Sequence, residues 1–104
     1  MAEWITVARS EDLGPGDREV FDINGVYIAL FNVDGTYYAV EDLCTHDDGP
    51  LADGILDGYE IECPRHGARF DIRTGAVLRL PAVTPIHHFD VRVQGGDVQI
   101  YFDL

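Results

Sequence analysis

Tight-turn dipeptides separate short apolar segments along most of this chain, and this pattern limits it to antiparallel strands. The turns include Asn24-Gly25 and Asp34-Gly35, which supply the positive backbone angles that two-residue hairpins require. We expect strands over residues 4–8, 19–23, 26–32, 36–41, 59–62, 86–93 and 97–102. No window of useful length shows a 3.6-residue apolar period, so the predicted class is all-β, with at most a short helix over 10–13.

The middle of the chain differs in composition from both ends. Residues 42–81 are dense in Gly, Pro, Asp, Cys and His and contain few long apolar runs. Such a segment cannot easily bury a core of its own, and a bound metal would hold it together. We therefore expect a single domain over 1–104. Its base is an antiparallel β-sandwich or incomplete barrel formed by 1–41 and 82–104, with 42–81 inserted as a small cluster-binding subdomain.

The composition excludes several classes of protein. Hydrophobic residues make up 46% of the 104 residues, but no apolar run approaches the roughly 20 residues that a membrane span needs. The first residues lack the positive flank and apolar stretch of a secretory signal, so we expect a cytoplasmic protein. Seven basic and 19 acidic residues give a formal net charge of −12. Nucleic acids and anionic membranes should repel this charge, and neither is an expected partner.

Both cysteines lie in the middle segment, and each is followed at close range by a histidine. The four residues are Cys44, His46, Cys63 and His66, with sixteen residues between the two pairs. Two thiolates and two imidazoles suit zinc or an iron–sulfur centre. Zinc fingers generally place two cysteines before two histidines, whereas here the two types alternate. We favour an iron–sulfur centre, and a structural zinc module that only binds partners is the alternative.

The spacing Cys-X-His, then Cys-X-X-His-Gly after 15 to 17 residues, resembles the fingerprint of Rieske-type [2Fe-2S] proteins. The matching residues are Cys44-Thr45-His46, Gly49-Pro50-Leu51, Asp53-Gly54, Cys63-Pro64-Arg65-His66-Gly67, Phe70-Asp71 and Gly75. The whole chain resembles the ferredoxin component of bacterial aromatic-ring-hydroxylating dioxygenases. This resemblance implies the Rieske fold and one 2Fe-2S cluster. It also implies that Cys44 and Cys63 bind one iron, while His46 and His66 bind the other.

The function that this resemblance implies is one-electron transfer. The donor would be a flavin-dependent ferredoxin reductase and the acceptor the terminal oxygenase, whose aromatic substrate stays open. The chain is too short to hold a flavin domain or a mononuclear iron site with a substrate pocket, so we expect neither catalysis nor a small-molecule substrate. The alternative within the same family is the small Rieske-like subunit of an assimilatory nitrite reductase.

Several positions depart from the respiratory branch of this family. Respiratory Rieske proteins carry two further cysteines at the places held here by Gly49 and Arg65, so we expect no disulfide to brace the site. They also carry a serine and a tyrosine that donate hydrogen bonds to sulfur, where this chain has Ala68 and Phe70. Fewer donors stabilise the oxidised cluster, and we predict a potential near the low end of the Rieske range, about −150 mV.

Two further groups of residues lie outside the four candidate ligands. His87 and His88 lie in a strand-like run outside the fingerprint, where alternation exposes one of the pair, and we expect a surface residue rather than a ligand. The glycines of the middle segment are expected to allow close approach of the backbone. They are Gly49, Gly54, Gly67 and Gly75.

Overall fold

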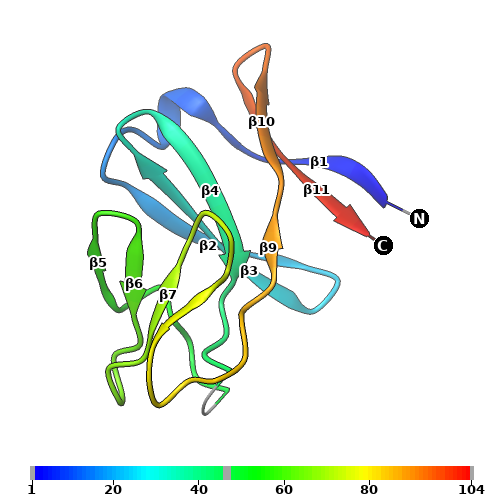
Figure 1. Cartoon of the computed structure of the whole chain (residues 1–104). Helices are drawn as coiled ribbons and strands as arrows, with labels where there is room; N and C mark the ends of the chain where they lie inside the picture. Colours follow the sequence, from blue (N-terminus) through cyan, green and yellow to red (C-terminus); the bar gives the residue numbers. More distant parts are fainter. Residues whose placement is uncertain (1, 46–47, 104) are drawn as a thin grey trace.

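The structure is a computed structural model that describes residues 2–45 and 48–103, and strands and turns dominate it (Figure 1). The strands are β1 (Ala2–Arg9), β2 (Arg18–Ile23), β3 (Val26–Val33), β4 (Thr36–Glu41), β5 (Ile55–Asp57), β6 (Glu60–Glu62), β7 (Arg69–Asp71), β8 (Val77–Arg79), β9 (His88–Phe89), β10 (Val91–Gln94) and β11 (Asp97–Asp103). One 3-10 turn, η1 (Ser10–Asp12), occupies the place where a short helix was predicted. The all-β class is confirmed, and no helix in the described ranges could cross a membrane.

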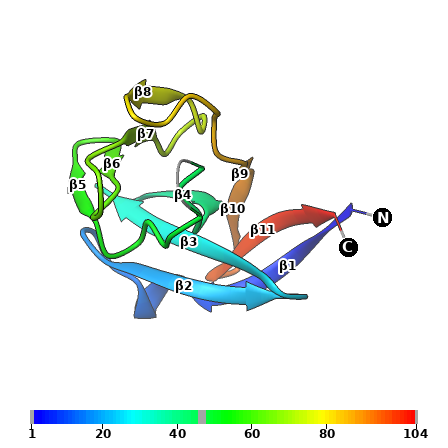
Figure 2. The ribbon, with the colours of Figure 1, turned by 90° about the horizontal axis from the view of Figure 1, so that it is seen from below.

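The strands form three antiparallel sheets. The first has the order β1-β11-β10, the second β2-β3-β4-β9 and the third β5-β6-β7-β8. Strands β5 to β8 gather at one end of the molecule, away from β1 and β11 (Figures 1 and 2). The predicted strands of both chain ends are present to within two residues, apart from the run over 86–93.

The hairpins that connect β2 to β3 and β3 to β4 have the turn geometry that their sequences predict. Asn24 and Gly25 have φ angles of 52° and 84°, and Asp34 and Gly35 have φ angles of 54° and 92°. Positive φ at both central residues is the signature of the type I′ turn, whose twist matches that of the flanking strands. The registers of β2, β3 and β4 follow directly from these two turns.

Strand β3 is buried on both faces and lies between two separate cores. Ile28 and Leu30 pack with β11 in one core, whereas Ala29 and Phe31 pack in a second core with the middle segment. Successive side chains of a strand point to opposite faces, so a nearly continuous apolar run serves two layers at once. The sheet β2-β3-β4-β9 is therefore the central layer of the fold.

The middle segment contains more strands than the sequence analysis predicted. Only 59–62 was expected to be extended there, and β5, β7 and β8 were missed because three-residue strands show no measurable alternation. Leu51, Ile61 and Phe70 are fully buried, in a core that they share with β3 and β4. The segment therefore packs against the central sheet, and this core holds it in addition to any metal.

The run over 86–93 is two strands rather than the single strand that was predicted. His88 and Phe89 pair with β4, whereas the residues from Val91 onward pair with β11 in another sheet. The chain changes sheets at Asp90, whose carbonyl accepts a hydrogen bond from the Tyr101 N–H at 3.0 Å. Such a corner joins the two sheets of the base into a sandwich.

Candidate metal centre

The loop that follows Cys44 is closed by two backbone hydrogen bonds. The Cys44 N–H donates to the Gly49 carbonyl at 2.7 Å, and the Asp48 N–H donates to the Cys44 carbonyl at 2.7 Å. Asp48 has a φ of 60°, which lets the chain reverse direction within the loop. These two hydrogen bonds hold Asp48 and Gly49 next to the backbone of Cys44.

The loop that follows Cys63 repeats this arrangement. The Cys63 N–H donates to the Ala68 carbonyl at 2.7 Å, and the Gly67 N–H donates to the Cys63 carbonyl at 3.1 Å. Gly67 has a φ of 76°, and a side chain there would meet no neighbour, so the glycine serves conformation rather than close approach. In both loops the residue four places after the cysteine has a positive φ. The two cysteines therefore begin loops that have the same backbone hydrogen-bond pattern.

The cysteines point inward, whereas the described histidine of the fingerprint lies outside. Cys44 and Cys63 are 0% and 1% exposed, belong to the same core and are thiols rather than a disulfide. His66 is exposed together with Pro64 and Arg65. His46 lies outside the described residues. Two buried thiols with an imidazole at the surface form a mixed donor set that suits an iron–sulfur centre near the surface.

Two side chains other than the candidate ligands anchor the first loop. The Asp42 carboxylate accepts hydrogen bonds at Oδ1 from the N–H groups of Leu51 and Ala52, both at 2.7 Å. The Thr45 hydroxyl donates to the Thr84 carbonyl at 2.5 Å, which ties the loop to the segment that returns to the base. Sequence reasoning missed Asp42, because a carboxylate nine and ten residues from its two partners leaves no local signal.

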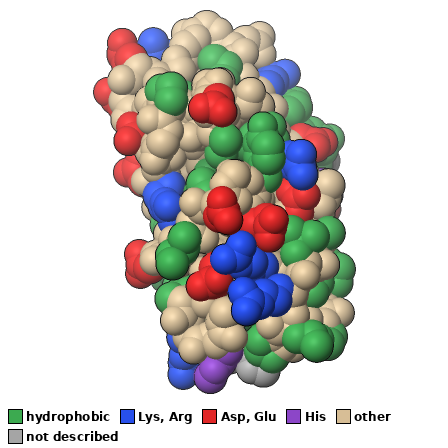
Figure 3. All heavy atoms as spheres, turned by 60° about the vertical axis from the view of Figure 1, so that its left-hand side comes forward, with side chains coloured by type: hydrophobic (Ala, Val, Ile, Leu, Met, Phe, Trp, Pro, Cys, Tyr) green, Lys and Arg blue, Asp and Glu red, His purple; other side chains and the backbone are tan. Residues whose placement is uncertain are grey.

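A group of ion pairs covers the strand that leads into Cys63. Arg69 donates to Glu62 at 3.0 Å, and its guanidinium lies 3.6 Å from Asp57 and 3.7 Å from Glu60. The hydrogen bond that Arg69 donates to Glu62 is the main reason that the pKa of Arg69 is raised. In Figure 3 basic side chains lie together among acidic ones on the side of the molecule that comes forward. This neutralisation is local, because the chain as a whole carries −12.

A second ion pair links the middle segment to the central sheet through aromatic rings. The Arg73 guanidinium donates to both carboxylate oxygens of Asp71, at 3.1 and 2.9 Å, and lies 4.3 Å from the Tyr59 ring centroid. Tyr59 in turn meets Tyr38 of β4 edge to face, with centroids 5.7 Å apart. The hydrogen bond from Arg73 lowers the pKa of Asp71.

Ala68 and Phe70, the positions at which respiratory relatives have hydroxyl groups, are both fully buried. They lie in the same core as Cys44 and Cys63. The Ala68 carbonyl is also the acceptor that closes the loop after Cys63. A hydroxyl introduced at either position would therefore be shielded from water. Water would not compete with its hydrogen-bond partner.

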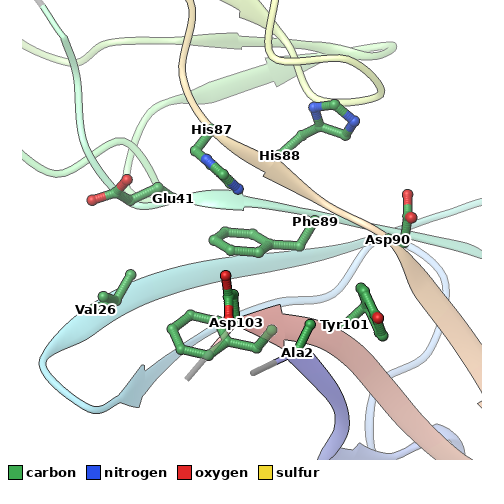
Figure 4. A pocket seen from close by; sticks show the side chains of 10 residues that line it. Ala2, Val26, Glu41, His87, His88, Phe89, Asp90, Tyr101 and Asp103 are labelled. Atoms are coloured by element: carbon green, nitrogen blue, oxygen red, sulfur yellow. The ribbon is translucent and has the colours of Figure 1, made fainter.

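A separate hollow of about 490 Å³ lies between β9 and β11 and contains none of the described fingerprint residues. The His87 ring lies over Phe89 with centroids 4.6 Å apart, whereas the His88 ring points away from it (Figure 4). Both histidines are exposed, so the prediction that alternation would expose only one is wrong. The strand begins at His88, and strand alternation therefore does not apply to His87.

Among the described residues, no group of three His, Cys, Asp or Glu side chains could hold a metal.

Comparisons with known proteins match nearly the whole chain. Residues 3–95 match the sequence profile described as the Rieske [2Fe-2S] domain. The ferredoxin component of the naphthalene 1,2-dioxygenase/salicylate 5-hydroxylase systems of Ralstonia sp is 40% identical over 97 residues, which cover 93% of each chain.

Solved structures agree with this match. The ferredoxin of carbazole 1,9a-dioxygenase from Nocardioides aromaticivorans IC177 superposes with a TM-score of 0.88 at 36% identity, over 93% of this chain and 95% of its own. A chain from a complex of reduced oxygenase and oxidized ferredoxin in carbazole 1,9a-dioxygenase also has a TM-score of 0.88 at 36% identity, over 94% of this chain and 92% of its own.

Proposed function

Because this chain belongs to the Rieske [2Fe-2S] domain family, we propose that it is the ferredoxin component of an aromatic-ring dioxygenase system. It carries a Rieske-type [2Fe-2S] cluster and is an electron carrier rather than a catalytic subunit. The proposed cluster ligands are Cys44, His46, Cys63 and His66. The observation that carries this assignment is the pair of matching loops, which bury both thiols in one core.

The donor set fits the chemistry of a mixed cluster. When bound, a [2Fe-2S] cluster accepts and releases one electron, and two imidazoles in place of two thiolates make that electron easier to add. Cys44 and Cys63 would hold the cluster through thiolates that are almost completely buried. His66 is exposed, as is the neighbouring Arg65. A docked partner can therefore approach the imidazole side directly.

The proposed partners are a flavin-dependent ferredoxin reductase, which supplies the electron, and a terminal oxygenase, which receives it. A structural relative is named as the ferredoxin in a complex with the oxygenase of carbazole 1,9a-dioxygenase, which supports the second partner. The exposed tip formed by Pro64, Arg65 and His66 is the proposed contact surface for both. We place the protein in the cytoplasm, where two thiols persist without forming a disulfide.

Purification and spectroscopy test the cluster assignment. The protein should be red-brown, contain two irons and two sulfides per chain, and give a rhombic electron paramagnetic resonance (EPR) signal with a low average g value after reduction. His66→Ala should lose this signal, whereas His88→Ala, which removes an exposed histidine outside the fingerprint, should keep it. A colourless protein with stoichiometric zinc would contradict the proposal.

A kinetic assay tests the carrier role. The protein should be reduced by a flavin-dependent ferredoxin reductase with NADH and reoxidised by a terminal aromatic-ring oxygenase, both within a stopped-flow experiment. The proposal fails if the native protein co-purifies with a large sirohaem subunit and exchanges no electrons with either dioxygenase partner. That result would identify the alternative function as a nitrite reductase subunit.

A further inference from the structure

The turn over residues 51–54 lies between the two cysteine loops and is held by a side chain from the base. Arg18 of β2 donates two hydrogen bonds from Nη1, to the carbonyl of Ala52 at 2.9 Å and to the carbonyl of Gly54 at 2.7 Å. These contacts cross 34 and 36 residues of sequence. A charged donor makes each bond stronger than one between neutral groups.

The N–H groups of the same turn bind a negatively charged side chain. The Asp42 carboxylate accepts from the N–H groups of Leu51 and Ala52, and Asp42 lies two residues before Cys44. The Ala52 N–H thus donates a hydrogen bond to the Asp42 carboxylate, and the Ala52 carbonyl accepts one from the Arg18 guanidinium. Any shift of the turn must lengthen hydrogen bonds to one charged group or the other, so the turn has a single preferred position.

The turn also abuts the strand that leads into the second loop. A Cβ atom at Gly54 would overlap the carbonyl oxygen of Glu62, the residue before Cys63, so the two backbones are in direct contact. The Leu51 side chain is fully buried in the core that contains both cysteines. Displacement of the turn would therefore move the backbone beside Cys63 and loosen the core around Cys44.

Arg18 is itself located by the central sheet. Its guanidinium carbon lies 5.5 Å from the centroid of the Phe31 ring, and Phe31 is fully buried between β3 and the middle segment. Arg18 and Phe31 are also directly paired across β2 and β3. The Arg18 guanidinium thus contacts both a buried side chain of β3 and the carbonyls of the 51–54 turn, so it links the central sheet to the turn.

We propose that Arg18 is a positioning residue for the cluster, because it fixes the 51–54 turn against both cysteine loops. This inference rests on the proposed ligand role of Cys44 and Cys63. Arg18 touches neither cysteine in the contacts described, so its effect passes through Ala52 and Gly54. Removing it leaves two carbonyls without their charged donor and frees the turn to shift, which opens the cluster to water and broadens the geometries of the ligands.

The test compares Arg18→Met with Arg92→Met in the cluster-loaded protein. Arg92 of β10 is the control, because it also donates a side-chain hydrogen bond, one rather than the two of Arg18, and lies over an aromatic ring, 4.3 Å from the Trp4 centroid, but in another sheet. The net charge changes equally in both. Two quantities are measured: the half-life of the visible absorbance in the presence of an iron chelator, and the line widths of the reduced EPR spectrum.

We expect Arg18→Met to shorten the half-life by at least about tenfold, because two hydrogen bonds from a charged group are lost and the loss of one already corresponds to roughly that factor in an opening equilibrium. Its EPR lines should broaden, which a loss of global stability alone would not cause. Arg92→Met should behave like the parent. Equal effects in the two variants, or parent-like behaviour of Arg18→Met, would overturn the inference.

Arg18→Lys provides a second variant in case Arg18→Met does not fold. It retains the charge and a donor but not the length of the side chain, so its half-life should be intermediate at an unchanged melting temperature. An unchanged half-life would overturn the inference. The two proposals fail differently. A parent protein without a rhombic signal refutes the cluster assignment, whereas a normal parent with an insensitive Arg18 refutes only the positioning role.

Discussion

Replacing Ala68 by Ser and Phe70 by Tyr should raise the midpoint potential of the cluster. Both positions are fully buried in the core that contains Cys44 and Cys63, so the new hydroxyls face no competing water. A hydroxyl that donates to a cluster or ligand sulfur withdraws electron density and stabilises the reduced state, which carries the greater negative charge. The parent potential is expected near the low end of the Rieske range, about −150 mV.

The magnitude follows from the strength of a buried hydrogen bond. A hydrogen bond to a charged group contributes about 1.5 to 3 kcal/mol, but only the difference between the reduced and oxidised states enters the potential. For the pair of hydroxyls we take about 1 to 2 kcal/mol, which corresponds to roughly 40 to 90 mV for one electron. Without the cluster, the double variant should be less stable than the parent, because a buried hydroxyl without a partner costs about 1 to 3 kcal/mol of folding free energy.

Protein-film voltammetry on the parent and the double variant measures the shift directly. A matched control is the pair Ala39→Ser and Phe102→Tyr, which places the same two hydroxyls in the other buried core, where neither cysteine lies. The control should leave the potential nearly unchanged. The reasoning is refuted if the Ala68 and Phe70 double variant has an unchanged or lower potential, or if the control shifts by the same amount. A parent potential well above zero would refute the low-potential assignment.

Two other perturbations test the electrostatics. Electron transfer from the reductase should slow as salt rises from about 0.05 to 0.5 M, because the screening length falls from over 10 Å to about 4 Å, and a rate independent of salt would indicate apolar docking. Asp71→Asn should lower the urea midpoint at pH 7, since the hydrogen bond from Arg73 lowers the pKa of Asp71 in the folded state. This stabilisation is complete above the ordinary value of 3.8 and is lost as the pH falls through the folded-state pKa, so parent and variant should converge in acid. A constant difference down to about pH 2 would contradict it.

Local sequence determined the hairpins and the chemistry of the candidate site. Asn24-Gly25 and Asp34-Gly35 adopt the positive angles that their residue types predict, because turn preference depends on only a few neighbouring residues. The alternating Cys and His residues predicted a metal centre of mixed donors for a similar reason, because the types of the ligands and their spacing can be read directly from the sequence. The match to the Rieske [2Fe-2S] domain confirmed the family that this spacing predicted.

The tertiary structure decided how the layers are arranged and which distant residues support the cysteine loops. The apolar run at 26–32 predicted a strand, but only packing shows that Ile28 and Phe31 serve different cores. The strand change at Asp90 and the contact of Arg18 with Ala52 likewise join residues that are remote in sequence. Such contacts join residues that the complete fold brings together, and closing the long loops between them has an entropic cost, so they leave no pattern in any short window of sequence.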